Sequence, residues 1–413
     1  MQPTETGLNK IGGYLTISLC LATALLEGLD LQSIGVVAPR IAREFHLGAA
    51  QLGWVFGFGG LGMLPGAVFG GMLADRIGRK RVLMLSAALF GIFSLATTQV
   101  SEINALLTVR LLTGLGLGAA MPTLIALCTE VASVERRGTA VGAMYCGMPT
   151  GAVLATVIGM ISPGEHEWRN IFFVGGFGPL LVLVLLAVFM KETSRIKRDE
   201  HDTRDKPMSV SQALWEEGRA RITLALWTSY LGTLIVIYFL INWLPYMVQA
   251  RGLTHEQAGV VQVLLTLGAA AGSVVIATLM DRIGSKPTLL GAYVGIALSL
   301  AILAGATGST SMALGGLLAG FFLTGAQAIL YAVTGMAYPT HVRGTCVGAT
   351  VAVGRLAPII GPLAAGQLLA NGQSSSMLLA TSIPVIVVAA VCALSVTRCV
   401  FSVDGVQTKV LTT

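Results

Sequence analysis

Charged residues are scarce in this chain. Asp, Glu, Lys and Arg make up 11% of its 413 residues, against about 25% in soluble globular proteins. Hydrophobic residues make up 54%. A soluble fold needs polar side chains to cover its surface, and this sequence does not supply enough of them. A lipid bilayer solvates apolar side chains instead, so the composition predicts an all-α protein embedded in a membrane.

Residue patterns for metal, nucleotide or disulfide chemistry are also missing. The six cysteines contain no CxxC pair, and the five histidines lie in polar connections without metal-ligand spacing. No GxxxxGK[ST] loop is present to hold the phosphates of ATP. We therefore expect no metal, no cofactor, no ATP-driven activity and no enzyme.

Twelve apolar stretches are long enough to cross the hydrocarbon core, which takes about 20 residues. They lie at 11–38, 51–74, 82–100, 103–128, 138–161, 170–190, 222–248, 257–280, 288–306, 311–336, 344–369 and 376–398. The first stretch is too long for a cleaved signal peptide and contains Glu27 and Asp30. We interpret it as the first transmembrane helix.

Basic residues orient these helices. With both termini in the cytoplasm, only Arg40, Arg43, Arg169 and Arg251 fall in the external connections, and nearly all other Lys and Arg face the cytoplasm. The net charge of +6 is then loop charge beside an anionic lipid leaflet, not a nucleic-acid surface. We expect a multi-pass protein of the bacterial inner membrane whose partners are lipids and which binds no nucleic acid.

An internal repeat divides the chain into two halves. Asp75-Arg76-Ile77-Gly78 recurs as Asp281-Arg282-Ile283-Gly284, and Arg137-Gly138-Thr139 recurs as Arg343-Gly344-Thr345, both at an offset of 206 residues. Two landmarks at one offset indicate a duplication. We predict a six-helix bundle over 1–190, a cytoplasmic linker over 191–221 and a second six-helix bundle over 222–413.

The first copy of this landmark resembles a family signature. Residues 71–81, GMLADRIGRKR, are similar to the G-x-L-a-D-r-x-G-r-k loop of the major facilitator superfamily, at the place where that family has it. The resemblance implies the major facilitator fold, with a gating contact centred on Asp75 and Arg79 and supported by Arg76. Asp281 stands in a degraded second copy. Glu130, Arg136 and Arg137 are expected to add a cytoplasmic charge network.

A narrower resemblance covers the chain end to end. Glu27-Gly28-Leu29-Asp30 resembles the D-G-x-D signature of the aromatic acid:proton symporter family, and further matches lie at residues 110–123, 242–245 and 354–362. The stretches EGLDLQ, INWLP, LYA and AVGRL are most similar to its hydroxyphenylpropionate-transporting subgroup. The resemblance implies uptake of an aromatic carboxylate coupled to protons through the first helix. Glu27 departs from the family's usual Asp.

The few charges inside predicted helices are the candidates for this coupling: Glu27, Asp30, Arg110 and Arg355. Each costs free energy in a bilayer and should face a cavity or a partner. Glu27 and Asp30 share one helix face, and two carboxylates that close disfavour joint ionisation. We expect one of them to carry the coupling proton. Arg110 either grips the substrate carboxylate or forms a salt bridge with one of these acids.

An aromatic substrate also needs stacking surface and a hydrogen-bonding rim. The candidates for this role are Tyr145, Tyr238, Asn242, Trp243, Gln327 and Tyr331, with Arg355 as a second cation. Gln327 and Tyr331 are four residues apart and therefore share one helix face.

Two functions remain after this reading. The first is a monomeric symporter that imports a small aromatic carboxylate with protons. The second is a proton-coupled exporter of drugs or metabolites. The exporter fits less well, because residues 147–151, Gly-Met-Pro-Thr-Gly, differ from the glycine-proline signature of antiporters in the same superfamily.

Overall fold

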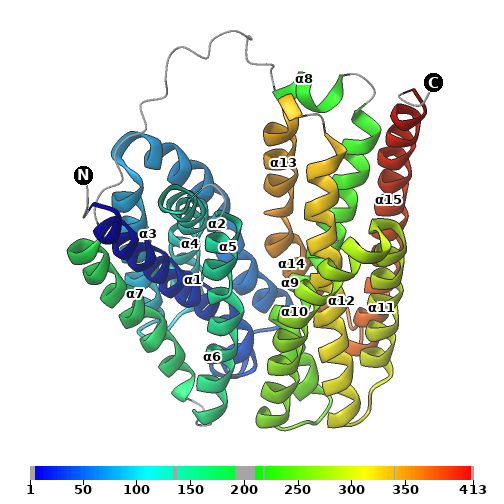
Figure 1. Cartoon of the computed structure of the whole chain (residues 1–413). Helices are drawn as coiled ribbons and strands as arrows, with labels where there is room; N and C mark the ends of the chain where they lie inside the picture. The colour runs from blue at the N-terminus through cyan, green and yellow to red at the C-terminus, as the bar shows by residue number, and fades with distance from the viewer. Residues whose placement is uncertain are drawn as a thin grey trace. The chain divides into compact units, whose positions relative to one another are not determined.

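The computed structural model describes residues 5–133, 137–162, 164, 166–190, 210–216, 219–338 and 340–410. Over these ranges the chain is helical and contains no strand (Figure 1). Twelve segments are long and apolar enough to cross a membrane, which confirms the predicted number of spans. The protein is a multi-pass membrane protein.

The chain forms two compact units, Met1–Lys197 and Arg198–Thr413. The helices of the first unit are α1 (Glu5–Glu44), α2 (Ala49–Ile77), α3 (Arg79–Thr97), α4 (Ile103–Val131), α5 (Arg137–Tyr145), α6 (Gly147–Ile161), the short 3-10 helix η2 (His166–Arg169) and α7 (Asn170–Phe189). Those of the second are α8 (Val210–Trp215), α9 (Ala220–Ala250), α10 (His255–Ile283), α11 (Ser285–Gly305), α12 (Ser309–Ala337), α13 (Thr340–Gly354), α14 (Ala357–Ala370) and α15 (Ser375–Val410).

The internal repeat of the sequence is repeated in the helix boundaries. Helices α2 and α4 begin and end 206 residues before α10 and α12, and α1 ends 206 residues before α9. The repeated landmark has the same backbone in both units: Gly78 follows α2 with φ 100°, and Gly284 follows α10 with φ 89°. A residue with a Cβ avoids this conformation, so glycine is required at both turns.

Small residues set the helix contacts within each unit. A Cβ added to Gly114 of α4 would meet the backbone of Gly59 on α2, and one added to Gly320 of α12 would meet Leu265 on α10. These four positions are also paired by the offset of 206. Gly151 of α6 approaches the backbone of Leu25 on α1 in the same way. In lipid no hydrophobic effect drives helices together, so the close approach of their backbones supplies the attraction between them.

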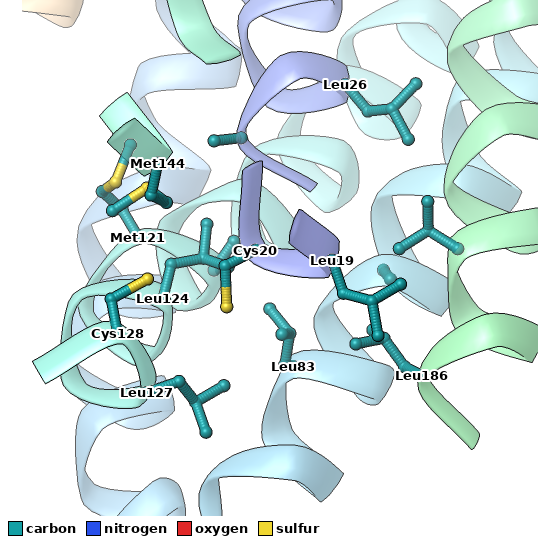
Figure 2. Close-up of a cluster of buried hydrophobic side chains, with 14 of the residues drawn as sticks. Leu19, Cys20, Leu26, Leu83, Met121, Leu124, Leu127, Cys128, Met144 and Leu186 are labelled. Carbon is teal, nitrogen blue, oxygen red and sulfur yellow. The ribbon is translucent and has the colours of Figure 1, made fainter. Parts of the chain in front are cut away.

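Buried hydrophobic side chains fill the interior of the first unit. Figure 2 shows part of this cluster, with labelled residues from α1, α3, α4, α5 and α7. Cys20 of α1 and Cys128 of α4 belong to it and are fully buried free thiols. They act as small apolar residues in this core.

Two of the twelve spans are interrupted helices, a feature that the sequence interpretation does not include. The span at 138–161 is divided at Cys146 into α5 and α6, and the span at 344–369 is divided after Gly354 into α13 and α14. A proline weakens the helix at each interruption. Pro149 and Pro358 have no N–H to donate to the carbonyl four residues earlier, so the helical hydrogen bonds to Tyr145 and Gly354 cannot form.

Most of the predicted linker, 191–209 with 217 and 218, lies outside the described residues. The part that is described includes α8, which packs against α9 and α13 of the same unit. The hydroxyl of Thr223 donates to the Leu214 carbonyl at 3.1 Å and shares a hydrogen bond of 2.9 Å with the Tyr338 hydroxyl. Burial raises the pKa of Tyr338, so this phenol stays neutral. Trp215 meets Trp227 edge to face.

Candidate functional site

Asp30 and Arg110 form a buried ion pair inside the first unit. Nη1 of Arg110 lies 3.3 Å from Oδ1 and 3.2 Å from Oδ2 of Asp30, and the two side chains are 3% and 0% exposed. The contact joins α1 to α4. One nitrogen serves both carboxylate oxygens, so the tighter arrangement with two parallel hydrogen bonds is not used. Of the two roles predicted for Arg110, the structure shows the salt bridge with Asp30.

Neighbouring helices enclose this pair. The Ser94 hydroxyl on α3 lies 3.4 Å from Oδ1 of Asp30, and the guanidinium of Arg110 lies 5.8 Å from the centroid of the Phe172 ring on α7. Nε of Arg110 has no hydrogen-bond partner among the described residues. The pair is therefore held in an apolar setting with one donor unsatisfied, which favours a change of partner when charge moves.

Glu27 lies one helical turn before Asp30 and is 1% exposed. The residue between them that packs most closely is Gly28, where an added Cβ would meet the backbone of Met148 on α6. Both acids are thus fixed on α1 by tight helix contacts. Ionisable side chains buried in a membrane-spanning helix are rare and are candidates for a functional site.

The predicted gating residues lie near helix ends: those of the first unit at the ends of α2 and α4 and the starts of α3 and α5, and Asp281 near the end of α10 in the second unit. Arg79, at the start of α3, forms a salt bridge with Glu130 near the end of α4. Lys80 donates to the carbonyls of Ala187 and Met190, where α7 ends. The backbone of Asp75 and Arg137 is helical, but their side chains lie outside the described residues. Arg76 and Asp281 are exposed.

The second unit holds the predicted aromatic and amide residues. Gln327 on α12 is 5% exposed, and neither atom of its amide has a hydrogen-bond partner among the described residues. Tyr331, one turn further on, is 48% exposed. Asn242 donates to the Tyr238 carbonyl. Trp243 is fully buried and donates its indole N–H to the Pro362 carbonyl at 3.1 Å, which ties α9 to α14.

Arg355 and Tyr145 both lie at the helix interruptions. Arg355 directly follows α13 and is half-buried, and Tyr145 is the last residue of α5 and is 40% exposed. Discontinuous helices expose backbone groups and are common at transporter binding sites. Among the described residues no group of three or more His, Cys, Asp or Glu side chains could hold a metal ion.

Three residues of these clusters are missing from the sequence interpretation: Ser94, Phe172 and Tyr230. The ring of Tyr230 on α9 meets that of Tyr331 edge to face, with centroids 5.3 Å apart. The sequence gives little sign of these neighbours, because spans that are apolar on every face do not show which residues point inward.

The comparison with protein families decides the class. The model for the Major Facilitator Superfamily matches residues 20–254 and 226–403. The chain belongs to the major facilitator superfamily. It is 45% identical to the 3-(3-hydroxy-phenyl)propionate transporter of Escherichia coli (strain K12), over 91% of this chain and 92% of that protein. It is 31% identical to the gallate transporter of Pseudomonas putida, over 88% of this chain and 87% of that protein. The resemblance seen in the sequence motifs is thereby confirmed.

Solved structures agree on the fold. A bacterial homolog of the human lysosomal transporter Spinster, in an inward-facing and unoccupied conformation, matches with a TM-score of 0.78 at 17% identity. The match covers 95% of this chain and 98% of that one. Together with the twelve spans, this confirms the all-α major facilitator fold. The family match and the relatives of 45% and 31% identity show that the protein is a transporter.

Proposed function

We propose that this transporter imports an aromatic carboxylate together with protons across the bacterial inner membrane. The substrate is 3-(3-hydroxyphenyl)propionate or a related phenolic acid, and transport proceeds by alternating access, as expected of duplicated bundles. The protein acts as a monomer with both termini in the cytoplasm. The similarity to transporters of a hydroxyphenylpropionate and of gallate supports the substrate class.

The observation that carries proton coupling is the buried pair of Asp30 and Arg110 beside Glu27. A proton delivered to Asp30 removes one charge of the pair and leaves the guanidinium unbalanced in an apolar setting. A substrate carboxylate can then replace Asp30 as the partner of Arg110. Release of the substrate and of the proton restores the original pair. This exchange reconciles the two roles predicted for Arg110.

The membrane potential determines what this cycle can accumulate. It favours inward positive charge by about 2.3 kcal/mol per charge per 100 mV. One proton with a monoanionic substrate would draw on the pH gradient alone, whereas two protons would use both gradients. Glu27 is the second proton carrier available on α1.

Uptake into proteoliposomes tests this function. We would measure accumulation of labelled 3-(3-hydroxyphenyl)propionate with and without an inward proton gradient, for the wild type and for Asp30→Asn. Gradient-driven accumulation that is lost in the variant is the expected result. If folded wild-type protein accumulates no compound from a panel of aromatic acids, the proposed substrate class is wrong. If accumulation persists in Asp30→Asn, the proton site moves to Glu27.

A further inference from the structure

Tyr230 occupies a position in the second unit that the proposed function leaves unused. It lies on α9 and is 2% exposed. Its ring stands at 90° to that of Tyr331 on α12, and the amide of Gln327 lies next to its hydroxyl. The three side chains come from two helices and form one cluster of two phenols and an amide.

The Gln327 amide is the unsatisfied polar group of this cluster. The Gln327 side chain is only 5% exposed, yet neither its oxygen nor its nitrogen has a hydrogen-bond partner among the residues that the structure describes. Leaving a buried amide in this state costs free energy. A group that carries both a donor and an acceptor would satisfy it. A phenolic hydroxyl is such a group, because it can donate to Oε1 and accept from Nε2 or from a tyrosine hydroxyl.

Tyr331 is the exposed member of the cluster. Its side chain is 48% exposed, although the rings of Tyr230 and Tyr331 touch and Gln327 lies one turn away on the same helix face. The cluster is thus buried at Tyr230 and open at Tyr331. The two tyrosine rings also offer faces and edges to a third aromatic ring.

The helix interruption of the eleventh span lies against the same residue. A Cβ added to Gly354, the last residue of α13, would meet the Tyr230 ring and Leu234. Only glycine lets the end of α13 come this close to the tyrosine. The ring of Tyr230 is therefore fixed from two sides, by Tyr331 and by α13, and its hydroxyl is held in place for recognition.

The first unit has no equivalent of this cluster. At the offset of 206, Tyr230, Gln327 and Tyr331 correspond to Ala24, Met121 and Ile125. The duplicated scaffold therefore does not require these polar side chains, and packing alone does not explain them. In the opposite direction, Asp30 and Arg110 correspond to Val236 and Gly316.

We infer that Tyr230, Gln327 and Tyr331 form the subsite that recognises the ring hydroxyl of a phenolic acid, with Tyr230 as a specificity-determining residue. This inference rests on the proposed function and adds the feature of the substrate that is selected. A neutral amide and two phenols suit a neutral hydroxyl. A site built to bond a hydroxyl discriminates strongly against an analogue without it, because its own polar groups are then left unpaired.

The test compares two substrates that differ only in that hydroxyl: 3-(3-hydroxyphenyl)propionate and 3-phenylpropionate. Uptake KM and maximal rate would be measured in proteoliposomes for the wild type, Tyr230→Phe and Gln327→Leu. We expect the wild type to prefer the hydroxylated compound by about tenfold or more in rate over KM, and both variants to lose most of this preference. Uptake of 3-phenylpropionate should fall much less.

Tyr293→Phe is the matched control. Tyr293 is another buried tyrosine of the same unit, but its hydroxyl bonds Ser229 and Thr233 at 2.9 Å each, within α9 and α11. Its loss should leave the preference unchanged. Equal loss of uptake of both substrates in Tyr230→Phe and Gln327→Leu, or an unchanged preference in both, would overturn the inference and leave the proposed function standing. A wild type that transports neither compound nor any other aromatic acid would overturn both.

Discussion

Arg169 and Glu44 form a salt bridge with two parallel hydrogen bonds, of 2.7 Å and 3.1 Å, between the start of α7 and the end of α1. Nε of the same arginine donates to the Thr98 carbonyl, where α3 ends. In the second unit Arg251 plays a similar part, because it donates to the Leu303 and Ala306 carbonyls at the end of α11. Helix α11 is the counterpart of α3, so an arginine closes this helix end in both units.

We predict that Arg169→Ala lowers the stability of the first unit. It removes charge-assisted hydrogen bonds to Glu44 and leaves the end of α3 without its donor, at a cost of about 1.5–3 kcal/mol. Thermal unfolding in detergent measures the effect as a lower Tm. Arg282→Ala serves as the control, because that arginine is exposed. Equal Tm values for the two variants would contradict this role.

A double neutralisation separates stability from coupling at the buried ion pair. Asp30→Asn alone leaves Arg110 charged and buried, which costs about 3–5 kcal/mol. Adding Arg110→Gln removes that charge, so we expect the double variant to regain most of the lost stability. Proton-driven uptake should stay absent in both, because neither retains the group that takes the proton. Uptake restored in the double variant would show that the pair is structural.

The contact between α1 and α6 depends on Gly151. An added Cβ would meet the Leu25 carbonyl oxygen, and backbone cannot move aside as a side chain can. We expect Gly151→Ala to cost about 1–3 kcal/mol and to lower the yield of folded protein. Gly142→Ala on α5 is the control, since nothing lies within 4 Å of its added Cβ. Size-exclusion yield and Tm measure both variants, and a tolerated Gly151→Ala would refute the close contact.

The backbone of Gly284 allows a test without steric contacts. Nothing lies within 4 Å of an added Cβ there, but φ is 89° and ψ is 161°, a region that is almost specific to glycine. Gly284→Ala should destabilise the protein by about 1–3 kcal/mol through backbone strain alone. Gly291→Ala, in the following helix and equally free of contacts, should be neutral or stabilising. The test is whether the Tm of Gly284→Ala falls below that of Gly291→Ala; a Tm that is equal or higher would contradict the prediction.

The sequence predicts the fold well, because hydropathy determines the spans and the repeated Asp-Arg-Ile-Gly landmark determines the duplication. The pairing of Asp30 with Arg110 was one of two predicted roles, since a charge in a span needs a partner. Sequence spacing alone cannot decide whether the partner of Arg110 is a protein carboxylate or a substrate carboxylate. The structure shows the first, and the second stays a proposal.

Other features could not be predicted from the sequence. Ser94 and Tyr230 lie in helices that are apolar on several faces, so their inward orientation depends on packing and not on periodicity. The interruptions at Cys146 and Arg355 leave hydropathy unchanged. Pro149 and Pro358 lie at these points, but Pro65 and Pro122 lie inside continuous helices, so proline alone does not predict an interruption. The roles of Asp75 and Arg137 stay predictions, because their side chains lie outside the described residues.

The difference between corresponding positions of the two units has an evolutionary consequence. Val236 and Gly316 stand where the first unit has Asp30 and Arg110, and Ala24 stands where the second has Tyr230. Under the roles proposed above, energy coupling and ligand choice are encoded in different halves of the gene. Mutations in the second half then change which substrate the cell takes up, while the residues that couple uptake to the proton gradient stay unchanged. Exchanging that half between relatives is a direct route to carriers for new aromatic compounds.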